Sequence, residues 1–418
     1  MPLTLAAAFK SLGVGPIQAR LPEFLACLAT IPVVFWLGCL LGSRRAGILA
    51  ALLLSVDNLF VLAARTVRPE AFVTLFAALA VLLYLISRQR KSLLAALLSG
   101  VALGAACNFH TNAVGIGISI GLLIFGDFGW SLWRSKRVWG IVAGSIALII
   151  PFVIWIATNA IRVQAFVRLY GRGGSLSLAQ AVHGEISRYS DLIGIGGQRL
   201  RLISFPIPLR LHVVLLVVAA VIVLERKRRA LSLTILALVI PSLLMWPKEM
   251  NITARYFAIL APYFALAVAL AWDALQPSKA RQLLAAFCVL AVVTQLAGNL
   301  VLLRQAHDAD FAAVSQGLRK AIPRDARVYG AMTFYLALYD RPYFAWHRTP
   351  VDYAVDKLEI NYLILNDRVL LHGTGHGSDD YREVRENSNA FVKHSADLIG
   401  QVPDPFYGNL EIYHVRGR

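Results

Sequence analysis

Acidic residues are scarce over most of the chain. Only nine carboxylates precede Arg304, and the 418-residue sequence carries a formal net charge of +17 at pH 7. Cysteine is also scarce, and the four thiols all fall inside apolar runs without the spacing of metal ligands: Cys27, Cys39, Cys107 and Cys288. The sequence therefore contains neither a disulfide framework nor a cysteine-rich zinc motif.

Polar residues as a class are too few for a water-soluble protein of this length. Charged residues make up 16% of the sequence and hydrophobic residues 58%, and the mean hydropathy is +0.63. A globular fold could not bury this much apolar surface. We therefore expect a mainly α-helical, integral membrane protein.

Ten apolar runs approach the ~20 residues that a helix needs to cross a hydrocarbon core. They lie at 23–42, 46–64, 70–87, 92–109, 112–127, 138–158, 209–224, 231–247, 256–273 and 282–303. Fourteen basic residues cluster in alternate connections, against four in the intervening short loops. The positive-inside rule makes the richer set cytoplasmic, so both ends of the chain are expected on the outer side. Because the basic residues form short clusters between apolar runs, we expect no nucleic-acid partner.

The composition changes at Arg304. Residues 304–418 hold fifteen acidic and fourteen basic residues and no spanning run. Their patterns predict helices at about 310–322 and 352–359, strands at 327–330, 361–365 and 410–415, and a mobile loop at 372–380. We expect a transmembrane domain over 1–303 and a small, soluble, extracytoplasmic α/β domain over 304–418.

One charged turn between two apolar runs draws attention. It reads Ala64-Arg65-Thr66-Val67-Arg68-Pro69-Glu70-Ala71-Phe72. Pro69 in the first turn of a helix, followed by Glu70 near the positive end of the helix dipole, would also suit an ordinary helix start. Among the carboxylates expected on the outer side, only Glu70 adjoins two arginines at a short turn. We therefore name Glu70 as a candidate catalytic residue.

Other polar residues lie at or inside the predicted spans. His110 ends one run, where it could either interact with the helix dipole or take part in catalysis as a second candidate. Asp57, inside the run 46–64, is either a functional group or, with Asn58, a polar bridge between helices. The long connection 159–208 is rich in arginine and of the length that is often functional.

Further cations are predicted at the outer boundary. Lys248, Arg255 and Tyr256 occupy one short loop. Such residues are common interface anchors, but together with Arg68 they could hold a phosphate at the membrane surface, because the guanidinium fork matches phosphate oxygens.

Several short motifs carry a family resemblance. In order they are Ala19-Arg20-Leu21-Pro22 opening a helix that ends at Gly42-Ser43-Arg44-Arg45, then the turn 64–70, then Arg255-Tyr256-Phe257 with Pro262. The arrangement resembles the polytopic GT-C glycosyltransferases, in particular the protein O-mannosyltransferase and lipid A aminoarabinose-transferase group. The resemblance covers about residues 1–300 and, loosely, the C-terminal domain.

The resemblance implies a function. Members of that group take a sugar from a polyprenyl-phosphate carrier and transfer it, with inversion, to a glycan, lipid or protein acceptor on the outer face of the bacterial inner membrane. Glu70 would correspond to their second-loop acidic residue, where it would bind a divalent cation, Mg or Mn, or the acceptor, and Arg255 would correspond to a basic residue near the carrier phosphate. Their principal catalytic acid lies in a first loop, but this chain has no acidic residue before Glu23. We expect a helix and that loop upstream of Met1.

Two other classes of function remain open. A noncatalytic membrane protein could share the scaffold and bind a glycolipid or a partner enzyme, and the absent acid favours this alternative. A secondary transporter is disfavoured, because the sequence shows neither an internal repeat nor paired helices broken by Gly or Pro.

Overall fold

The computed structural model describes residues 2–110, 113–160, 258–305, 310–345, 351–366 and 377–417. Contacts divide the chain into two compact units. The first consists of Met1–Thr4, Arg20–Arg199 and Phe205–Asn299, and the second of Leu5–Ala19, Leu200–Ser204 and Leu300–Arg418. The predicted division at residue 304 stays a prediction.

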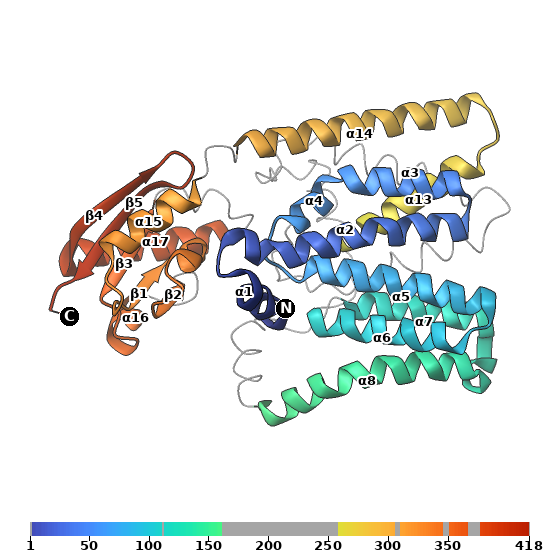
Figure 1. The fold of residues 1–418 in the computed structure, drawn as a ribbon, viewed down its shortest axis with the longest axis horizontal. Coiled ribbons are helices and arrows are strands. Elements are labelled where there is room, and N and C mark those ends of the chain that lie inside the picture. Colours follow the sequence, from blue (N-terminus) through green and yellow to red (C-terminus); the bar gives the residue numbers. More distant parts are fainter. Residues whose placement is uncertain are drawn as a thin grey trace. The chain divides into compact units, whose positions relative to one another are not determined.

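Helices build the N-terminal part of the chain (Figure 1). In chain order they are α1 (Pro2–Leu12), α2 (Pro16–Leu41), α3 (Arg44–Val56), α4 (Asn58–Ala64), α5 (Glu70–Arg90), α6 (Leu93–Phe109), α7 (Ala113–Phe128), the 3-10 segment η1 (Gly129–Arg134), α8 (Lys136–Thr158), α13 (Ala261–Ala274) and α14 (Lys279–Gln305). Within the described ranges, five helices are long and apolar enough to cross a membrane, or six if α3 and α4 together form one bent span. The chain is therefore a multi-pass membrane protein.

Eight of the ten predicted runs coincide with described helices. The runs 209–224 and 231–247 lie outside the described residues, so the total of ten spans stays a prediction. Two runs are shorter helices than predicted: α6 has 17 residues and α13 has 14. The run 46–64 is not one helix, because α3 and α4 meet at Asp57 with a bend of 64°.

The residues at this break explain it. The backbone N–H of Asp57 ends α3 by donating to the carbonyl of Leu54, and its side-chain oxygen accepts from the N–H of Phe60 at 2.8 Å, capping α4. Aspartate is a favoured N-cap. Asp57 is buried and serves here as a helix cap, and the backbone positions on either side of it bond to side chains of α14.

Charged residues at the C-terminal ends of α5 and α7 pair with one another. Asp127 lies 3.2 Å from the Arg88 guanidinium and accepts from the Tyr84 hydroxyl at 2.5 Å. Asp273, in the last turn of α13, accepts from the Ser43 hydroxyl at 2.6 Å. Both carboxylates therefore have structural partners.

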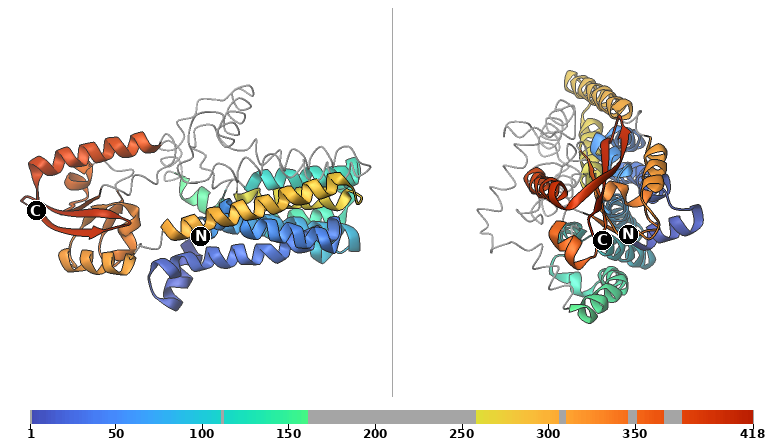
Figure 2. Two further views of the ribbon diagram at one scale, coloured as in Figure 1. Left: turned by 90° about the horizontal axis from the view of Figure 1, so that it is seen from above. Right: turned by 90° about the vertical axis from the view of Figure 1, so that its left-hand side faces the viewer.

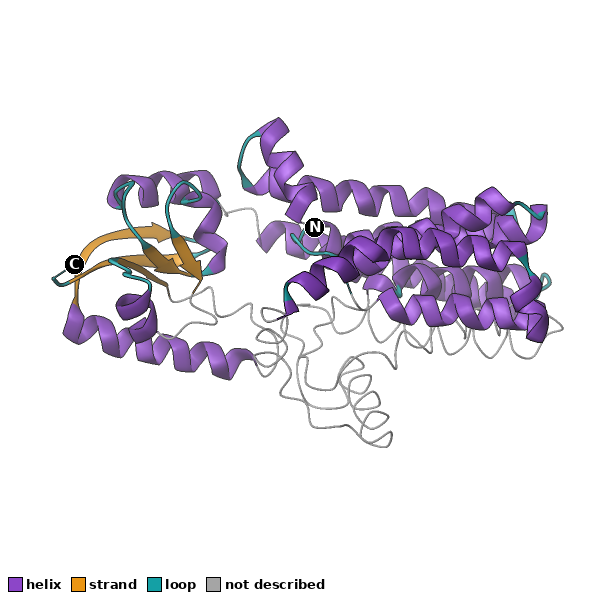
Figure 3. Cartoon of the chain, turned by 90° about the horizontal axis from the view of Figure 1, so that it is seen from below, coloured by secondary structure: helices purple, strands orange, loops and turns teal. Residues whose placement is uncertain are grey.

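The C-terminal part of the second unit, here called the C-terminal unit, is a small α/β fold in which the strands lie between helices (Figure 3). Its sheet has the order β2-β1-β3-β5-β4. The strands are β1 (Val328–Gly330), β2 (Tyr343–Ala345), β3 (Tyr362–Asn366), β4 (Ala396–Asp404) and β5 (Gly408–Val415). Strand β1 is parallel to β2 and β3, whereas β5 is antiparallel to β3 and β4. A mixed sheet with helices confirms the predicted small α/β structure.

Helices cover both faces of this sheet (Figure 2). Helix α15 (Phe311–Ala321) lies on one face and α17 (Gly377–Ser395) on the other, and the shorter segments η3 (Met332–Ala337) and α16 (Val351–Lys357) complete the layers. Val314 and Leu318 of α15 join a core with Phe334 and Ile364. This amphipathic pattern is the one predicted at 310–322.

Part of the predicted loop at 372–380 is helical, because α17 begins at Gly377. Residues 371–376, including His372 and His376, lie outside the described ranges. The polar composition of α17 hid its helical pattern from the sequence reading.

Candidate functional site at the Arg65–Glu70 turn

Local hydrogen bonds shape the turn between α4 and α5. The Thr66 hydroxyl donates to the carbonyl of Leu62 at 3.1 Å, and the Arg68 N–H donates to the carbonyl of Thr66 at 2.9 Å. Pro69 is the N-cap of α5 and Glu70 its first residue, so Pro69 lies one position before the predicted first turn. Its φ of −68° suits that place and its missing N–H costs nothing there.

Glu70 and Arg68 form an ion pair. The Arg68 Nε donates to Oε1 of Glu70 at 2.9 Å and to Oε2 at 3.2 Å. The Glu70 side chain is only 2% exposed and that of Arg68 is 29% exposed. The buried carboxylate therefore holds one edge of a partly exposed guanidinium in a fixed orientation.

His110 lies close to this ion pair. It is the C-cap of α6, and its backbone N–H donates to the carbonyl of Ala106 at 3.1 Å. Burial lowers the pKa of His110, the charge of Glu70 opposes this, and the charge of Arg68 adds to it. These interactions bring together three of the predicted site residues, Glu70, Arg68 and His110.

Aromatic stacking fixes the end of α6 against α5. The Phe109 ring stacks on Phe72, with centroids 4.4 Å apart and planes 6° apart, and on Phe76 at 5.7 Å. Stacked aromatic pairs contribute ~0.5–1.5 kcal/mol beyond their buried area. Since Phe109 precedes His110, the stack holds the histidine beside the first turn of α5.

Arg65 adds positive charge to the same turn. Burial lowers the pKa of its guanidinium, and the nearby charge of Arg20 on α2 lowers it further. The like charges of Arg65 and Arg20 repel one another, so an anion bound near both would be favoured. Arg20 belongs to the first motif of the family resemblance and Arg65 to the turn, but the sequence patterns predicted no role for either side chain.

The chain segment that follows the predicted phosphate ligands reaches this site. The Thr74 hydroxyl of α5 contacts the carbonyl of Ala258 at 3.5 Å, and Ile259 packs in a buried cluster with Val73 and Ala106. The predicted residues Lys248, Arg255 and Tyr256 themselves lie outside the described residues.

Glu23 is another carboxylate expected on the outer side, but its sequence neighbours gave it no role. It is fully buried on α2, and among the described residues neither of its oxygens has a hydrogen-bond partner. One turn further along α2, Cys27 contacts the Phe60 carbonyl at 4.0 Å, which puts Glu23 level with the end of α4. The scarcity of acidic residues was a signal that could have marked it.

The described residues do not suit a divalent cation at Glu70. Within those ranges, no three His, Cys, Asp or Glu side chains come together as metal ligands. Both Glu70 oxygens already accept from Arg68. The described residues thus supply no full set of donors here, and the Mg or Mn ion at Glu70 stays a prediction.

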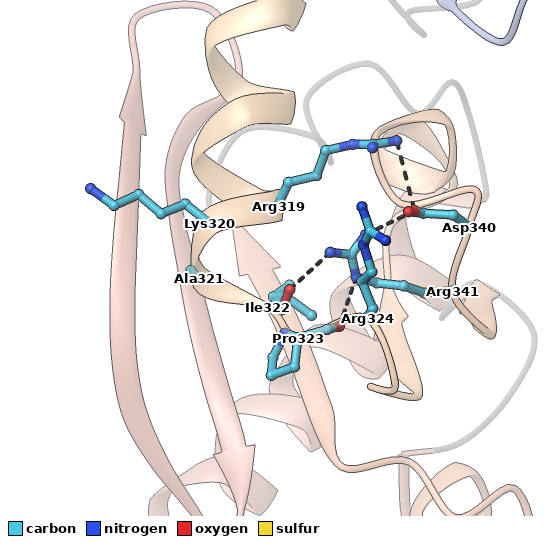
Figure 4. Close-up of a pocket in the computed structure, with 8 residues that line it drawn as sticks. All are labelled: Arg319, Lys320, Ala321, Ile322, Pro323, Arg324, Asp340 and Arg341. Carbon is cyan, nitrogen blue, oxygen red and sulfur yellow. Dashed lines mark hydrogen bonds and ion pairs between the residues drawn. The ribbon is translucent and has the colours of Figure 1, made fainter.

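A basic pocket of about 370 Å³ lies in the C-terminal unit, at the end of α15 (Figure 4). Its Arg341 donates to the carbonyls of Ile322 and Pro323 and to Asp340, while Arg319 donates to the carbonyl of Ala337. Arginines that bond the last carbonyls of a helix stabilise its end. This cluster therefore joins α15 to the following segment and serves the fold.

Comparison with known proteins places the geometry in context. The family model for dolichyl-phosphate-mannose-protein mannosyltransferase matches residues 1–155. No curated protein sequence matches the chain. The crystal structure of ArnT from Cupriavidus metallidurans bound to undecaprenyl phosphate is similar with a TM-score of 0.64 and 14% identity, covering 99% of this chain and 87% of that one. The apo structure of the same protein is similar with a TM-score of 0.64 and 14% identity, covering 99% of this chain and 86% of that one.

The matched family model includes the whole turn and His110, and the shared fold extends over nearly the entire chain. The predicted resemblance to the protein O-mannosyltransferase and aminoarabinose-transferase group of GT-C glycosyltransferases is therefore confirmed.

Proposed function

We propose that this chain is a membrane glycosyltransferase that takes a sugar from a polyprenyl-phosphate carrier and transfers it to a glycan, lipid or protein acceptor. The reaction would take place on the outer face of the bacterial inner membrane, with the C-terminal unit in the periplasm. The observation that supports this most is the cluster of Arg65, Arg68, Glu70 and His110 at one end of the helices. The similar ArnT structure contains undecaprenyl phosphate.

The arginines suit the carrier phosphate. Arg65 lies near the positive charge of Arg20. Glu70 orients Arg68 by accepting from its Nε, and one pair of the terminal N–H groups of Arg68 lies on the opposite edge of the guanidinium. A phosphate held by such donors gains charge when the sugar leaves, and fixed positive charge stabilises that change. Lys248, Arg255 and Tyr256 would complete the phosphate site.

An inverting transfer is a single displacement. The acceptor oxygen forms a bond to the anomeric carbon, the bond from that carbon to the phosphate oxygen breaks, and the phosphate leaves on the carrier. The proton of the acceptor hydroxyl must go to a base. Because burial favours neutral imidazole at His110, this side chain can act as the base that accepts it, while Glu70 keeps Arg68 in place.

Transfer of labelled sugar from polyprenyl-phosphate sugars, measured in membranes that contain the full-length protein, tests this function. We expect Glu70→Ala to lower transfer ~100-fold, the size of loss seen when a fixed electrostatic donor is removed. Asp127→Ala is the matched control, because Asp127 forms an arginine pair at the opposite end of α7. Equal activity in wild type and Glu70→Ala would remove Glu70 from the mechanism.

The pairing of both Glu70 oxygens with Arg68 also favours a second candidate, a noncatalytic protein that binds a glycolipid or partner enzyme on this scaffold. The same membranes separate the two functions. A wild-type protein that binds polyprenyl phosphate but transfers no sugar from any donor would support the noncatalytic one.

A further inference from the structure

The break between α3 and α4 opens the backbone of an apolar span. Helix α3 ends at Val56 and α4 begins at Asn58, with a bend of 64° between them. In a hydrocarbon environment, backbone N–H and C=O groups released by such a break cost several kcal/mol each unless another group pairs with them. The partners of these groups therefore decide whether the bend is stable.

Helix α14 supplies those partners from a single turn. The Asn58 N–H donates to Oε1 of Gln295 at 2.9 Å, and Nδ2 of Asn299 donates to the carbonyl of Val56 at 2.9 Å. Residues four apart lie on the same face of a helix. One donor and one acceptor thus bond the two backbone positions on either side of Asp57.

The same turn of α14 approaches the bend very closely. A Cβ atom on Gly298 would lie 2.5 Å from Nδ2 of Asn58, so only glycine fits there without movement. Gln295 and Asn58 are each only 4% exposed. We call the bonds of Gln295 and Asn299 to this bend the α14 latch.

The latch is costly for a membrane helix. An apolar α14 beside a straight span would need no buried amides, and polar residues inside a membrane are expensive and tend to mark functional positions. Among the described residues, the side-chain amide of Asn58 and Oδ1 of Asn299 have no hydrogen-bond partner at all. The bend is thus maintained against an energetic penalty.

The direction of α4 sets the position of the candidate site. This helix has only seven residues and ends at Ala64, directly before Arg65. We propose that Gln295 and Asn299 are positioning residues of the transferase: by holding the bend, they fix where α4 carries the Arg65–Glu70 turn. This inference depends on the proposed glycosyltransfer.

Four variants of the full-length protein test the latch. Gln295→Met removes the acceptor at similar size, Gln295→Glu keeps an acceptor oxygen, and Asn299→Leu removes the donor. Thr294→Val is the control, because within the described ranges the Thr294 hydroxyl bonds to carbonyls of its own helix, those of Leu290 and Ala291. Sugar transfer is measured as kcat per folded molecule, beside hydrogen exchange of the peptide that spans residues 54–68.

We expect Gln295→Met and Asn299→Leu to lower kcat about tenfold or more, since a displacement of ~1 Å at a reacting centre can cost that much. Exchange at 56–58 should become faster in both. Gln295→Glu should keep kcat within about threefold of wild type, which corresponds to a rise of ~0.7 kcal/mol in the activation barrier. Thr294→Val should behave as wild type.

An unchanged kcat per folded molecule, with only thermal stability reduced, would show a purely structural role and overturn the proposal. Unchanged hydrogen exchange in both latch variants would also overturn it. A wild-type chain without transfer activity would instead count against the proposed function, and the exchange data would then decide alone whether the latch fixes the bend.

Discussion

At the scale of single residues, the candidate site consists of charges that have been placed in a partly apolar environment. Glu70 is buried but paired with Arg68, whereas the buried carboxylate of Glu23 has no partner among the described residues. A buried polar group left unpaired costs ~1–3 kcal/mol, and more when it is charged. The two carboxylates therefore contribute to stability with opposite sign.

Replacing Glu23 should reveal this cost. Glu23→Gln keeps the shape and removes the charge, so we expect a higher melting temperature in detergent, with a gain that grows as the pH is raised and more of the wild-type carboxyl is ionised. Thermal unfolding of both proteins across a pH series measures it. A lower melting temperature at every pH would mean that the carboxylate has a partner that stabilises its charge.

His110 should make stability depend on pH. Its pKa is lowered in the folded protein, so the unfolded chain binds the proton more readily and ΔG of unfolding falls as the pH drops below about 6.5, the ordinary histidine value. The contribution is fully present above that pH. We expect His110→Gln to lose less stability than wild type between about pH 7 and pH 5.

Thermal unfolding of the two proteins at both pH values checks this. Parallel pH profiles would show that His110 is not buried as described and would weaken its role as the base.

Glu70 and His110 could be nominated from the sequence, because each adjoins a helix end between apolar runs. The lack of a partner for Glu23 could not, since pairing depends on which helices meet in space.

At the scale of elements, glycines set how closely the helices pack. A Cβ on Gly144 of α8 would lie 2.2 Å from the carbonyl of Leu97 on α6, and one on Gly104 would lie 2.7 Å from the carbonyl of Ser145. The spacings Gly100 to Gly104 and Gly140 to Gly144 are those of small residues at close helix crossings in membranes. Helices α6 and α8 therefore meet through their backbones.

Gly144→Ala should separate α6 from α8 and lower thermal stability. Gly121→Ala on α7 is the matched control, because a Cβ there meets nothing within 4 Å, and alanine in place of a helical glycine alone stabilises by up to ~1 kcal/mol. The predicted result is a loss in Gly144→Ala with no loss in Gly121→Ala. Melting temperatures in detergent decide it, and equal shifts in the two variants would contradict the close crossing.

Sequence patterns predicted elements well where apolar periodicity was strong. The helix α5 and the strands β1, β3 and β5 appear where expected. The pattern failed at 46–64, because hydropathy does not report a bend that a cap and another helix create. It also missed α17 and the edge strand β4, whose residues are largely polar or exposed.

At the scale of the whole molecule, orientation in the membrane follows from the distribution of basic residues. The connections at Arg88 to Lys91 and at Lys279 to Arg281 are predicted to be cytoplasmic, and the residues after Leu303 to be outside. Single cysteines at Ser92, Ser278 and Ser378, in a chain whose four native cysteines are replaced, report this orientation. We expect an impermeant thiol reagent added outside to label position 378 alone.

Labelling of position 92 from outside would reverse the assignment, and with it the side on which the Arg65–Glu70 turn meets its substrate. The turn precedes α5 and Ser92 follows it. The same experiment therefore shows on which side of the membrane the candidate site lies.

The central claim is that the Arg65–Glu70 turn and His110 form the site for a carrier phosphate. The most direct measurement uses a polyprenyl phosphate with a photoreactive group beside its phosphate, crosslinked to the full-length protein in membranes and mapped by mass spectrometry. The account predicts labelled peptides from residues 64–74 and 106–113, with less label in Arg68→Ala than in Arg88→Ala. Label confined to peptides at the opposite end of α5, around residues 84–91 and 127–137, would contradict it.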